Sequence, residues 1–566
     1  MPDALDALDA SGGGRDDGVV ARRRSWWGWG YEEDALAPAE AARLGALLGP
    51  AFGLDLEPRR APPLASLSLP APRLAPPPSL SAICSSDTGE RAAHAYGKAY
   101  RDVVRALAGR IDHPPDVVAR PRDESEVTAV LDWCAEAGAA VIPYGGGSSV
   151  VGGVEPAVGD DYGGAVTLDV GAMGAVVEVD DRSGAARIQA GALGPSLEEQ
   201  LRPHGLTLRH FPQSFECSTL GGWIATRAGG HFATGPTHID DLVESVRMVT
   251  PAGVLATRRL PASGAGPSPD RLVLGSEGAL GVITEAWVRV RPRPRWRAGG
   301  SARFPTWSSG AQAVRALACS GLAPANCRLV DPVEALVNGA GDGTAAVLIV
   351  GFESAEHPVG HWGALAASCV ADHGGTPEGD WGADDDRGPD ARGTGGGEPA
   401  AGGTAGSADA WRRSFLRAPY VRDALVTLGA MVETFETAVT WDRFDVLHAE
   451  VTAAVQGALD AQGAAGGFVT CRLTHAYPDG AAPYFTVIAP ARRGGELEQW
   501  DEVKAAASDA LLAAGGTITH HHAVGRDHRP WYDRQRPALY GDVLRAAKAA
   551  LDPAWICNPG VLVDRT

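Results

Sequence analysis

The sequence has no excess of basic residues. Its 50 Lys and Arg residues stand against 69 Asp and Glu residues, which gives a formal net charge of −19 at pH 7. A protein that binds nucleic acid needs a basic surface to neutralise the phosphates. The charge therefore argues against nucleic acid as a partner, although a local arginine cluster can still hold a small anionic substrate.

Long apolar runs and paired cysteines are also missing. The sequence contains no apolar run of about 18 residues and no signal-peptide pattern, so we expect neither a membrane span nor secretion. The eight cysteines are scattered without a CxxC pair, which predicts reduced, structural thiols. These absences indicate the cytoplasm, and the final residues VDRT carry no peroxisomal address.

What is present is ordinary for a globular protein of two or three domains. Hydrophobic residues make up 45% and charged residues 21% of the 566-residue chain. Strand-like and helical segments interleave, which predicts a mixed α/β, or α+β, fold. The expected helices are 91–108, 125–138 with Ser125 as N-cap and Gly138 as C-cap, and 422–435; the expected strands include 116–121 and 139–147.

A glycine-rich loop follows one of these strands. Pro143, Tyr144, Gly145, Gly146, Gly147, Ser148 and Ser149 form the sequence PYGGGSS. Consecutive glycines let backbone N–H groups approach a pyrophosphate, and the hydroxyl groups add donors. The loop is neither a Walker motif nor a GxGxxG motif, so by itself a plain turn is an equally good interpretation.

Two further glycine-rich segments follow this loop. QSFECSTLGGWIATRAGG, residues 213–230, combines small and hydroxyl side chains of the kind that hold a backbone close to a flat ligand. GSEGALGVITEAWVRVRP, residues 275–292, predicts a turn that leads into a strand.

The three segments, in this order, resemble the FAD-binding domain of the vanillyl-alcohol oxidase/PCMH flavoprotein superfamily. The resemblance implies a two-subdomain FAD-binding domain and an α+β cap domain with an antiparallel sheet. It also implies that FAD is bound non-covalently, because the glycine loop has no histidine to attach it. The residues implied to bind FAD are those of the glycine loop, Gln213, Ser214, Phe215, Glu216, Cys217, Ser218, Thr219, Ala225, Thr226, Arg227, Ala228, Glu277, Gly278, Ala279, Leu280, Gly281, Val282 and Ile283.

The expected domain organisation follows from this resemblance and from composition. We expect a disordered N-terminus at 1–24, an arm and helical segment at 25–109, the FAD-binding domain at 110–294, a cap domain at 295–515 with a flexible insertion at 372–408, and a C-terminal segment at 516–566 that packs back on the FAD site.

Other stretches narrow the resemblance to the alkyldihydroxyacetonephosphate synthase family. They are SWWGWGY, NCRLVD, ETAVTWDR, CRLTHAYPDGAAPYF and GGTITHHHAVG. The family exchanges the acyl chain of acyl-dihydroxyacetone phosphate for a fatty alcohol without net redox change. The Ala-, Gly- and Arg-rich composition points to a bacterial-type member. A lipid substrate suggests peripheral contact with a membrane. The resemblance is also compatible with a homodimer.

Single residues are assigned roles by the same resemblance. Tyr484 matches the catalytic tyrosine, which must be activated to act as a base because the ordinary pKa of a phenol is about 10. Arg422 matches an arginine for the substrate anion, and its planar fork suits phosphate or carboxylate. Arg328 matches an arginine that the family needs for activity, although a structural ion pair is an almost equal alternative.

Three consecutive histidines, His520, His521 and His522, stand near the C-terminus. On a strand, the first and third would share one face. A zinc site would need further ligands at fixed spacing, and the sequence offers none nearby, so we expect no metal. The resemblance places the triplet beside the flavin, which implies a cluster that handles protons and contacts anions.

Two alternatives stay open from the sequence. The ending NPGVLV resembles FAD-linked oxidases and dehydrogenases of alcohols or 2-hydroxy acids. Those relatives often carry GEHGIG where this chain has HHHAVG, which argues against that function without excluding it. A flavoprotein without catalytic activity is the third interpretation.

Overall fold

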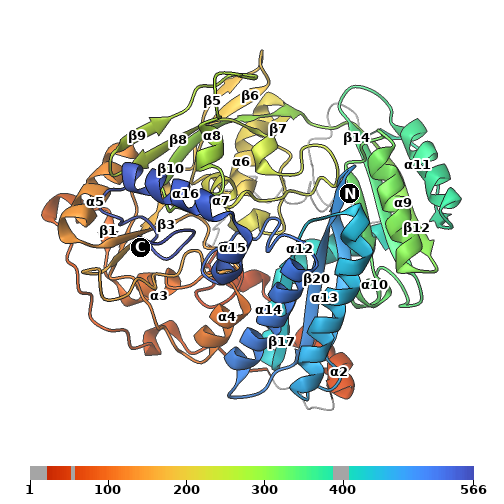
Figure 1. Ribbon diagram of the computed structural model, residues 1–566, viewed down its shortest axis with the longest axis horizontal. Coiled ribbons are helices and arrows are strands. Elements are labelled where there is room, and N and C mark those ends of the chain that lie inside the picture. Colours follow the sequence, from red (N-terminus) through yellow and green to blue (C-terminus); the bar gives the residue numbers. More distant parts are fainter. Residues whose placement is uncertain (1–21, 53–57, 387–406, 566) are drawn as a thin grey trace, which may run out of the picture.

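A computed structural model describes residues 22–52, 58–386 and 407–565. Figure 1 shows one side of the molecule built on the N-terminal sheets and the other on the long sheet of the C-terminal half, with the C-terminal helices returning to the first side. The α+β fold expected from the sequence is confirmed. No helix of the described residues is both long and apolar enough to cross a bilayer.

A four-stranded sheet, in the order β1-β2-β4-β3, carries the glycine loop at one strand end. Its strands β2, β4 and β3 are parallel. Residues of β3 are mostly buried, which suits a continuous apolar strand in a parallel sheet. The elements of this region are α3 (Thr88–Ala93), α4 (Tyr100–Leu107), α5 (Glu124–Ala137), β1 (Cys84–Ser85), β2 (Val117–Ala119), β3 (Ala140–Tyr144) and β4 (Ala165–Asp169).

A five-stranded antiparallel sheet, β5-β6-β10-β8-β9, stands beside the first sheet, and a small pair β7-β11 lies next to it. A separate apolar core fills the space between this sheet and its helices. Its elements are β5 (Val176–Asp180), β6 (Ala185–Gln189), α6 (Gly194–Leu201), β7 (Leu206–Thr207), α7 (Leu220–Thr226), β8 (Val243–Thr250), β9 (Gly253–Ala256), α8 (Asp270–Val273), β10 (Val282–Arg289) and β11 (Arg291–Pro292).

The largest sheet runs β15-β12-β14-β13-β19-β20-β17, with β16 on β12 and β18 on β20, and every pairing is antiparallel. The largest apolar core lies on this sheet. Its strands are β12 (Trp296–Phe304), β13 (Asn326–Val330), β14 (Ala346–Ser354), β15 (Thr376–Glu378), β16 (Asp385–Asp386), β17 (Ala430–Glu436), β18 (Val439–Thr440), β19 (Phe468–Ala476) and β20 (Gly480–Pro490).

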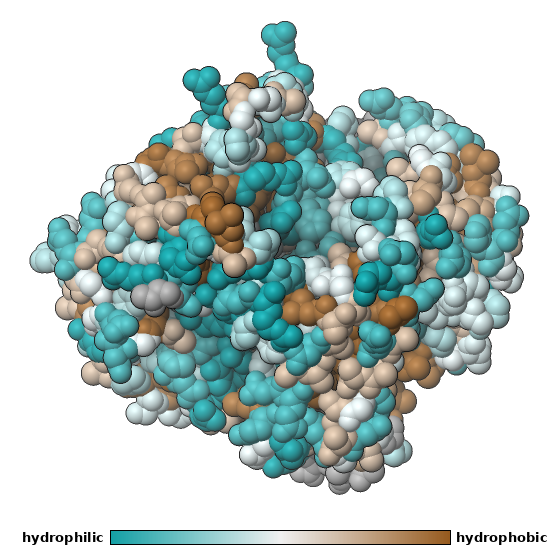
Figure 2. Space-filling model, viewed as in Figure 1, coloured by the Kyte–Doolittle hydropathy of each residue, from teal (hydrophilic) through white to brown (hydrophobic). Residues whose placement is uncertain are grey.

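Helices cover this sheet and close the molecule. They are α9 (Trp307–Cys319), α10 (Pro332–Val337), α11 (Gly360–Asp372), α12 (Ser407–Leu428), α13 (Trp441–Ala461) and α14 (Glu496–Ala513), with α2 (Pro38–Phe52) from the arm and α15 (Arg529–Gln535) and α16 (Ala538–Leu551) at the end. Figure 2 shows hydrophobic surface where α16 lies in Figure 1, and Leu539, Tyr540 and Val543 are its exposed apolar residues.

The last residues rejoin the first sheet. Val141 of β3 donates to the Ile556 carbonyl at 2.8 Å, and Asn558 donates to the Val141 carbonyl at 2.8 Å. The buried Lys548 ammonium binds the carbonyls of Ala279 and Cys557, each at 2.6 Å. These bonds fasten the C-terminal segment beside the glycine loop and the turn before β10.

Several local predictions are confirmed and others are wrong. Helix α5 ends at Gly138 with a φ of 61°, as predicted, but its N-cap is Asp123 rather than Ser125, because the Asp123 carboxylate accepts from the Glu126 N–H at 3.0 Å. The helix expected at 91–108 is broken between α3 and α4. The helix expected at 422–435 ends at Leu428, and the chain turns at Gly429 into β17.

The ends of two segments expected to lack structure are ordered. Residues 376–378 and 385–386, inside the expected flexible insertion, pair with β12, and Trp381 between them is buried. At the N-terminus, Arg24 pairs with Tyr31 in an isolated bridge. The remainder of both segments, 1–21 and 387–406, lies outside the described residues. All eight cysteines are free thiols, as expected.

Candidate functional site

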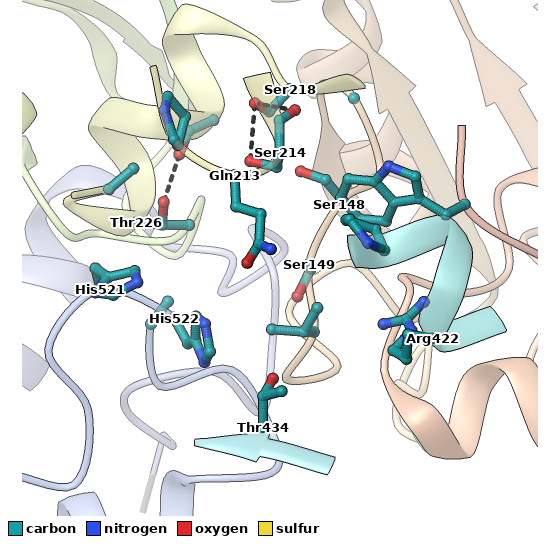
Figure 3. Close-up of a pocket in the computed structure, with 18 of the residues that line it drawn as sticks. Ser148, Ser149, Gln213, Ser214, Ser218, Thr226, Arg422, Thr434, His521 and His522 are labelled. Atoms are coloured by element: carbon teal, nitrogen blue, oxygen red, sulfur yellow. Dashed lines mark hydrogen bonds between the residues drawn. The ribbon is translucent and has the colours of Figure 1, made fainter. Parts of the chain in front are cut away.

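One cavity of about 460 Å³ lies between the two N-terminal sheets, the long sheet and the arm. Figure 3 shows Gln213 pointing into it, with His521 and His522 on one side and Arg422 on the other. Loops from distant parts of the chain meet here because the C-terminal segment and the arm both fold back over the strand ends. The cavity is therefore a product of tertiary structure.

The glycine loop forms part of the wall. A Cβ atom on Gly146 would lie 1.7 Å from the Cys217 carbonyl oxygen, and one on Gly145 would lie 2.3 Å from Thr219 Oγ1. The loop can therefore pack against residues 217–219 only without side chains. Within the described residues, the N–H groups of Gly146, Gly147 and Ser148 donate to no other protein group. These residues line the cavity, and their N–H groups suit a pyrophosphate.

Most residues that the resemblance assigned to FAD line this cavity. They are Pro143, Tyr144, Gly145, Gly146, Gly147, Ser148, Ser149, Gln213, Ser214, Ser218, Thr219, Ala225, Thr226, Ala228, Glu277, Gly278, Gly281, Val282 and Ile283. Their backbone amides, hydroxyl groups and small side chains fit a dinucleotide with a flat ring.

Six assigned residues do not line the cavity, because each is engaged elsewhere. Phe215 and Leu280 belong to the apolar core of the five-stranded sheet, and Cys217 packs with Trp29 and Tyr420. The remaining three are Glu216, which accepts from Tyr420; Arg227, which pairs with Asp240; and Ala279, whose carbonyl binds Lys548.

Glu277 connects the cavity wall to the C-terminal segment. Its carboxylate accepts from the N–H groups of Val524 and Gly525 at 2.8 and 2.7 Å. Burial raises the pKa of Glu277 to about 7 in spite of these bonds. This residue therefore holds two loops together as well as facing the cavity.

Tyr484 lies on β20 in the cavity wall. Its partners across the sheet are Glu436 on β17 and Arg472 on β19. Burial raises the pKa of Tyr484, and the nearby Arg472 cation opposes this effect without overcoming it. Burial therefore favours the protonated phenol, and the role of activated base that the resemblance implies for Tyr484 stays a prediction.

The histidine triplet lies in a loop. The Glu436 carboxylate accepts from the N–H groups of His520, His521 and His522 at 2.6, 3.0 and 2.8 Å, and from Thr519 Oγ1 at 2.7 Å. The buried Glu436 side chain thus accepts the N–H groups that a neighbouring strand would bind in a sheet. His521 and His522 line the cavity, whereas His520 lies behind them and contacts His521.

The charges of this cluster are set by burial and by Glu436. Burial opposes ionisation of Glu436, but the carboxylate accepts from the backbone N–H groups of all three histidines, and its pKa lies well below its usual range. Burial lowers the pKa of His521 to about 3, although Glu436 acts in the opposite direction. At neutral pH the cluster is therefore a carboxylate beneath neutral imidazoles.

Two sets of side chains come close enough to hold a metal ion: His475, His520 and His521, and Glu436, His521 and His522. No third ligand could be predicted from the sequence, because His475 and Glu436 approach the triplet only in the folded chain. The oxygens of Glu436 are already engaged by four donors from residues 519–522, so the contacts favour a loop anchor over a metal ligand.

The two assigned arginines lie in different surroundings. Arg422 lines the cavity, and its guanidinium donates to Asp423 at 3.0 and 2.6 Å and to the Lys98 carbonyl at 2.5 Å. Arg328 is 2% exposed and is not among the cavity-lining residues. Burial and the neighbouring Arg472 lower the pKa of Arg328 to about 9.

Several site residues were missed from the sequence. Thr434, Arg472 and Trp29 line the cavity, and Glu436 supports its histidines. Glu436 lies in ETAVTWDR and Arg472 in CRLTHAYPDG, two stretches that carry the family resemblance. Their residue types alone did not indicate what either side chain does in the site. The arm also reaches the site through Arg24, which donates to the Gly146 carbonyl at 2.7 Å.

Comparisons with known proteins agree with this architecture. A family described as FAD binding domain matches residues 115–258, and one described as FAD linked oxidases, C-terminal domain, matches residues 293–562. An alkyldihydroxyacetonephosphate synthase from Dictyostelium discoideum is 31% identical over 504 residues, 84% of this chain and 77% of that protein. One from Trypanosoma brucei brucei is 30% identical over 512 residues, 84% and 78% of the two chains. A solved structure of an alkyldihydroxyacetonephosphate synthase superposes with a TM-score of 0.76 at 26% identity, covering 97% of this chain and 99% of that one.

Proposed function

Because the chain belongs to the alkyldihydroxyacetonephosphate synthase family, we propose that it exchanges the acyl group of acyl-dihydroxyacetone phosphate for a fatty alcohol, with FAD as cofactor. The observation that carries this proposal is the composition of the cavity. It combines donors for a dinucleotide, an arginine for an anion, proton-handling side chains and an apolar wall. The Ala- and Gly-rich composition supports a bacterial-type member.

The apolar wall suits an alkyl chain. It is built from residues of α2, α10, α12 and the long sheet: Leu44, Leu47, Leu48, Val337, Leu425, Val432, Phe468 and Ile488. Such a wall removes a hydrocarbon chain from water, with a gain of roughly 0.8 kcal/mol per buried CH₂ group. A hydroxy-acid substrate would need no wall of this kind.

The polar residues divide the chemistry between them. Arg422 binds the phosphate, because it lines the cavity while Asp423 and the Lys98 carbonyl fix the orientation of its guanidinium. His521 is neutral and accepts the proton of the alcohol. Tyr484 donates a hydrogen bond to the departing carboxylate, whose charge develops in a largely buried site.

The cofactor adds one element. When bound, FAD supplies a ring whose N5 can bond to a carbon atom and accept or return an electron pair. The protein residues then orient the substrate over that ring and exclude water. Positions that point a phenol, two imidazoles and a guanidinium into one cavity support this division of roles.

Peripheral membrane contact is part of the proposal. Leu47 of α2 lines the cavity and is 67% exposed, so a lipid chain can enter there from a bilayer. Leu47→Asp should reduce sedimentation with phospholipid vesicles, while the distant exposed residue Leu365→Asp should leave sedimentation unchanged.

An FAD-linked oxidase is the second candidate, favoured by the family that matches residues 293–562. One anaerobic experiment separates the two. The purified yellow protein is mixed with acyl-dihydroxyacetone phosphate and a long-chain alcohol, and separately with alcohols and 2-hydroxy acids alone. The synthase should give an ether product and a flavin that ends oxidised. Bleaching of the flavin by an alcohol or hydroxy acid alone, without ether product, would establish the oxidase instead.

A further inference from the structure

A chain of hydrogen-bonded histidines runs from the cavity to the surface. His521 lines the cavity, and its Nδ1 lies 3.0 Å from Nδ1 of His520. Nε2 of His520 lies 3.1 Å from Nε2 of His238. His238 is half-buried and belongs to the loop that precedes β8, far from the triplet in sequence.

His238, at the outer end of these three histidines, fixes the direction of the hydrogen bonds between them. Nδ1 of His238 lies 2.9 Å from the Arg227 carbonyl, which can only accept, so Nδ1 carries the proton of a neutral His238. Its Nε2 is then an acceptor, and the Nε2–H of His520 is shared between it and Tyr477 Oη at 2.7 Å, whose own proton can go to Thr237 Oγ1 at 3.1 Å. Nδ1 of His520 is therefore an acceptor as well, and His521 donates to it. This leaves Nε2 of His521 as the acceptor toward the cavity.

The proposed reaction produces a proton that must leave. The bond from C1 of dihydroxyacetone phosphate to the acyl oxygen breaks, and its electron pair leaves with the carboxylate. The bond from C1 to the alkyl oxygen forms, and the alcohol loses one proton. At neutral pH a fatty acid stays ionised, since carboxyl groups have pKa values near 4. Each turnover consequently releases one proton inside the cavity.

We propose that His521, His520 and His238 form the exit route for this proton, with His238 as its outer end; the inference rests on the proposed function. His521 takes the proton on Nε2 and passes its Nδ1 proton to His520. His520 passes its Nε2 proton to His238, and the half-buried His238 ring releases a proton to water.

The surroundings stabilise a charge along this route. One oxygen of Glu436 lies 3.5 Å from Nδ1 of His521 and 3.9 Å from Nδ1 of His520. The carboxylate therefore faces the transient imidazolium at both inner rings. Tyr477 Oη lies 2.7 Å from Nε2 of His520 and holds that ring in place. The His475 ring packs 5.0 Å from His520 and binds the Gly230 carbonyl.

The test uses the flavin-loaded enzyme and the variant His238→Gln. Glutamine can still bond to the Arg227 carbonyl but cannot accept and release a proton. We expect kcat for alkyl transfer to fall about tenfold or more, with unchanged KM and flavin content. Added imidazole should restore the rate in proportion to its concentration. The matched control is His373→Gln, another half-buried histidine whose Nδ1 binds a backbone carbonyl, at 2.8 Å, and it should resemble the wild type.

Each other outcome overturns the route. An unchanged kcat in His238→Gln would show that the proton leaves elsewhere. A lower kcat that imidazole does not restore would show a structural role only. Stoichiometric zinc in the purified protein would show that the histidines are metal ligands. If His238→Gln loses flavin, the imidazole response of the flavin-loaded fraction of His238→Ala decides the question. A wild type without ether product instead refutes the proposed function itself.

Discussion

The Arg472 guanidinium lies over the ring of Tyr484, 3.9 Å from its centroid. Glu334 pairs with Arg472 at 2.7 Å and fixes this position. The cation lowers the pKa of the phenol, but burial is the larger effect and keeps Tyr484 protonated. This contact therefore orients a hydrogen-bond donor toward the cavity.

Replacing Tyr484 by phenylalanine removes that donor and little else. Because the ring can keep its place against Arg472, we expect Tyr484→Phe to bind flavin normally and to lose at least about 100-fold in alkyl transfer. The measurement is steady-state turnover with flavin content by absorbance. Tyr162→Phe, which loses a bond to the Trp555 carbonyl outside the cavity, is the control and should stay active. Normal turnover by Tyr484→Phe would remove the phenol from the chemistry.

Replacing Glu436 by glutamine should disturb the whole histidine loop. The amide oxygen can keep the bonds of only one carboxylate oxygen, and the NH₂ group cannot accept from the N–H groups that the other oxygen now binds. We expect a loss of about 1–3 kcal/mol in unfolding free energy and a severe loss of kcat.

The control for this variant lies on the same strand. Glu433 of β17 pairs with Lys504 and Trp500, away from the cavity. Glu433→Gln should also lower stability, measured by denaturant unfolding, but should retain kcat per folded enzyme. Equal kcat in both variants would contradict the role of Glu436 as the anchor of a functional loop.

Adding one methyl group at Gly146 should abolish cofactor binding. In Gly146→Ala the Cβ would lie 1.7 Å from the Cys217 carbonyl oxygen, so the loop must move away from residues 217–219. We expect a folded but colourless protein, checked by visible absorbance and circular dichroism. Gly457→Ala, whose Cβ meets nothing within 4 Å on helix α13, should remain yellow. A yellow Gly146→Ala protein would argue against the pyrophosphate position.

The buried histidines predict a loss of stability in acid. Burial lowers the pKa of His210 to about 3, so below about pH 6.5 the unfolded chain binds a proton that the native state does not. Stability must therefore fall as pH decreases below that value, by about 1.4 kcal/mol per pH unit for each such histidine.

His210→Phe tests this effect at one position. The new ring can keep the contact with Trp223, whose centroid lies 5.1 Å from that of His210. Its unfolding free energy, measured between about pH 4.5 and 6, should depend on pH less steeply than that of the wild type, by about one proton. An identical slope would show that His210 is protonated in the native state. The control is His357→Phe, a variant of an exposed histidine.

Local segments of the site could be predicted from the sequence. The strand β3 and its glycine loop, the C-cap Gly138 and the strand β10 were predicted because they depend on neighbouring residues only. One error was local, because Asp123, two residues before Ser125, is the N-cap. The loop at the histidines has a long-range cause, because Glu436 on β17 accepts from their N–H groups.

The sequence by itself determined the alternation of strands and helices, the glycine loop that can approach a phosphate, and the family resemblance, because these depend on residue order and local conformation. Only the tertiary structure decided that burial raises the pKa of Tyr484, that Arg328 lies outside the cavity while Trp29 lies in it, and that His238 meets His520. Burial and contacts between residues far apart in the chain set pKa values and proton paths, and no local pattern encodes them.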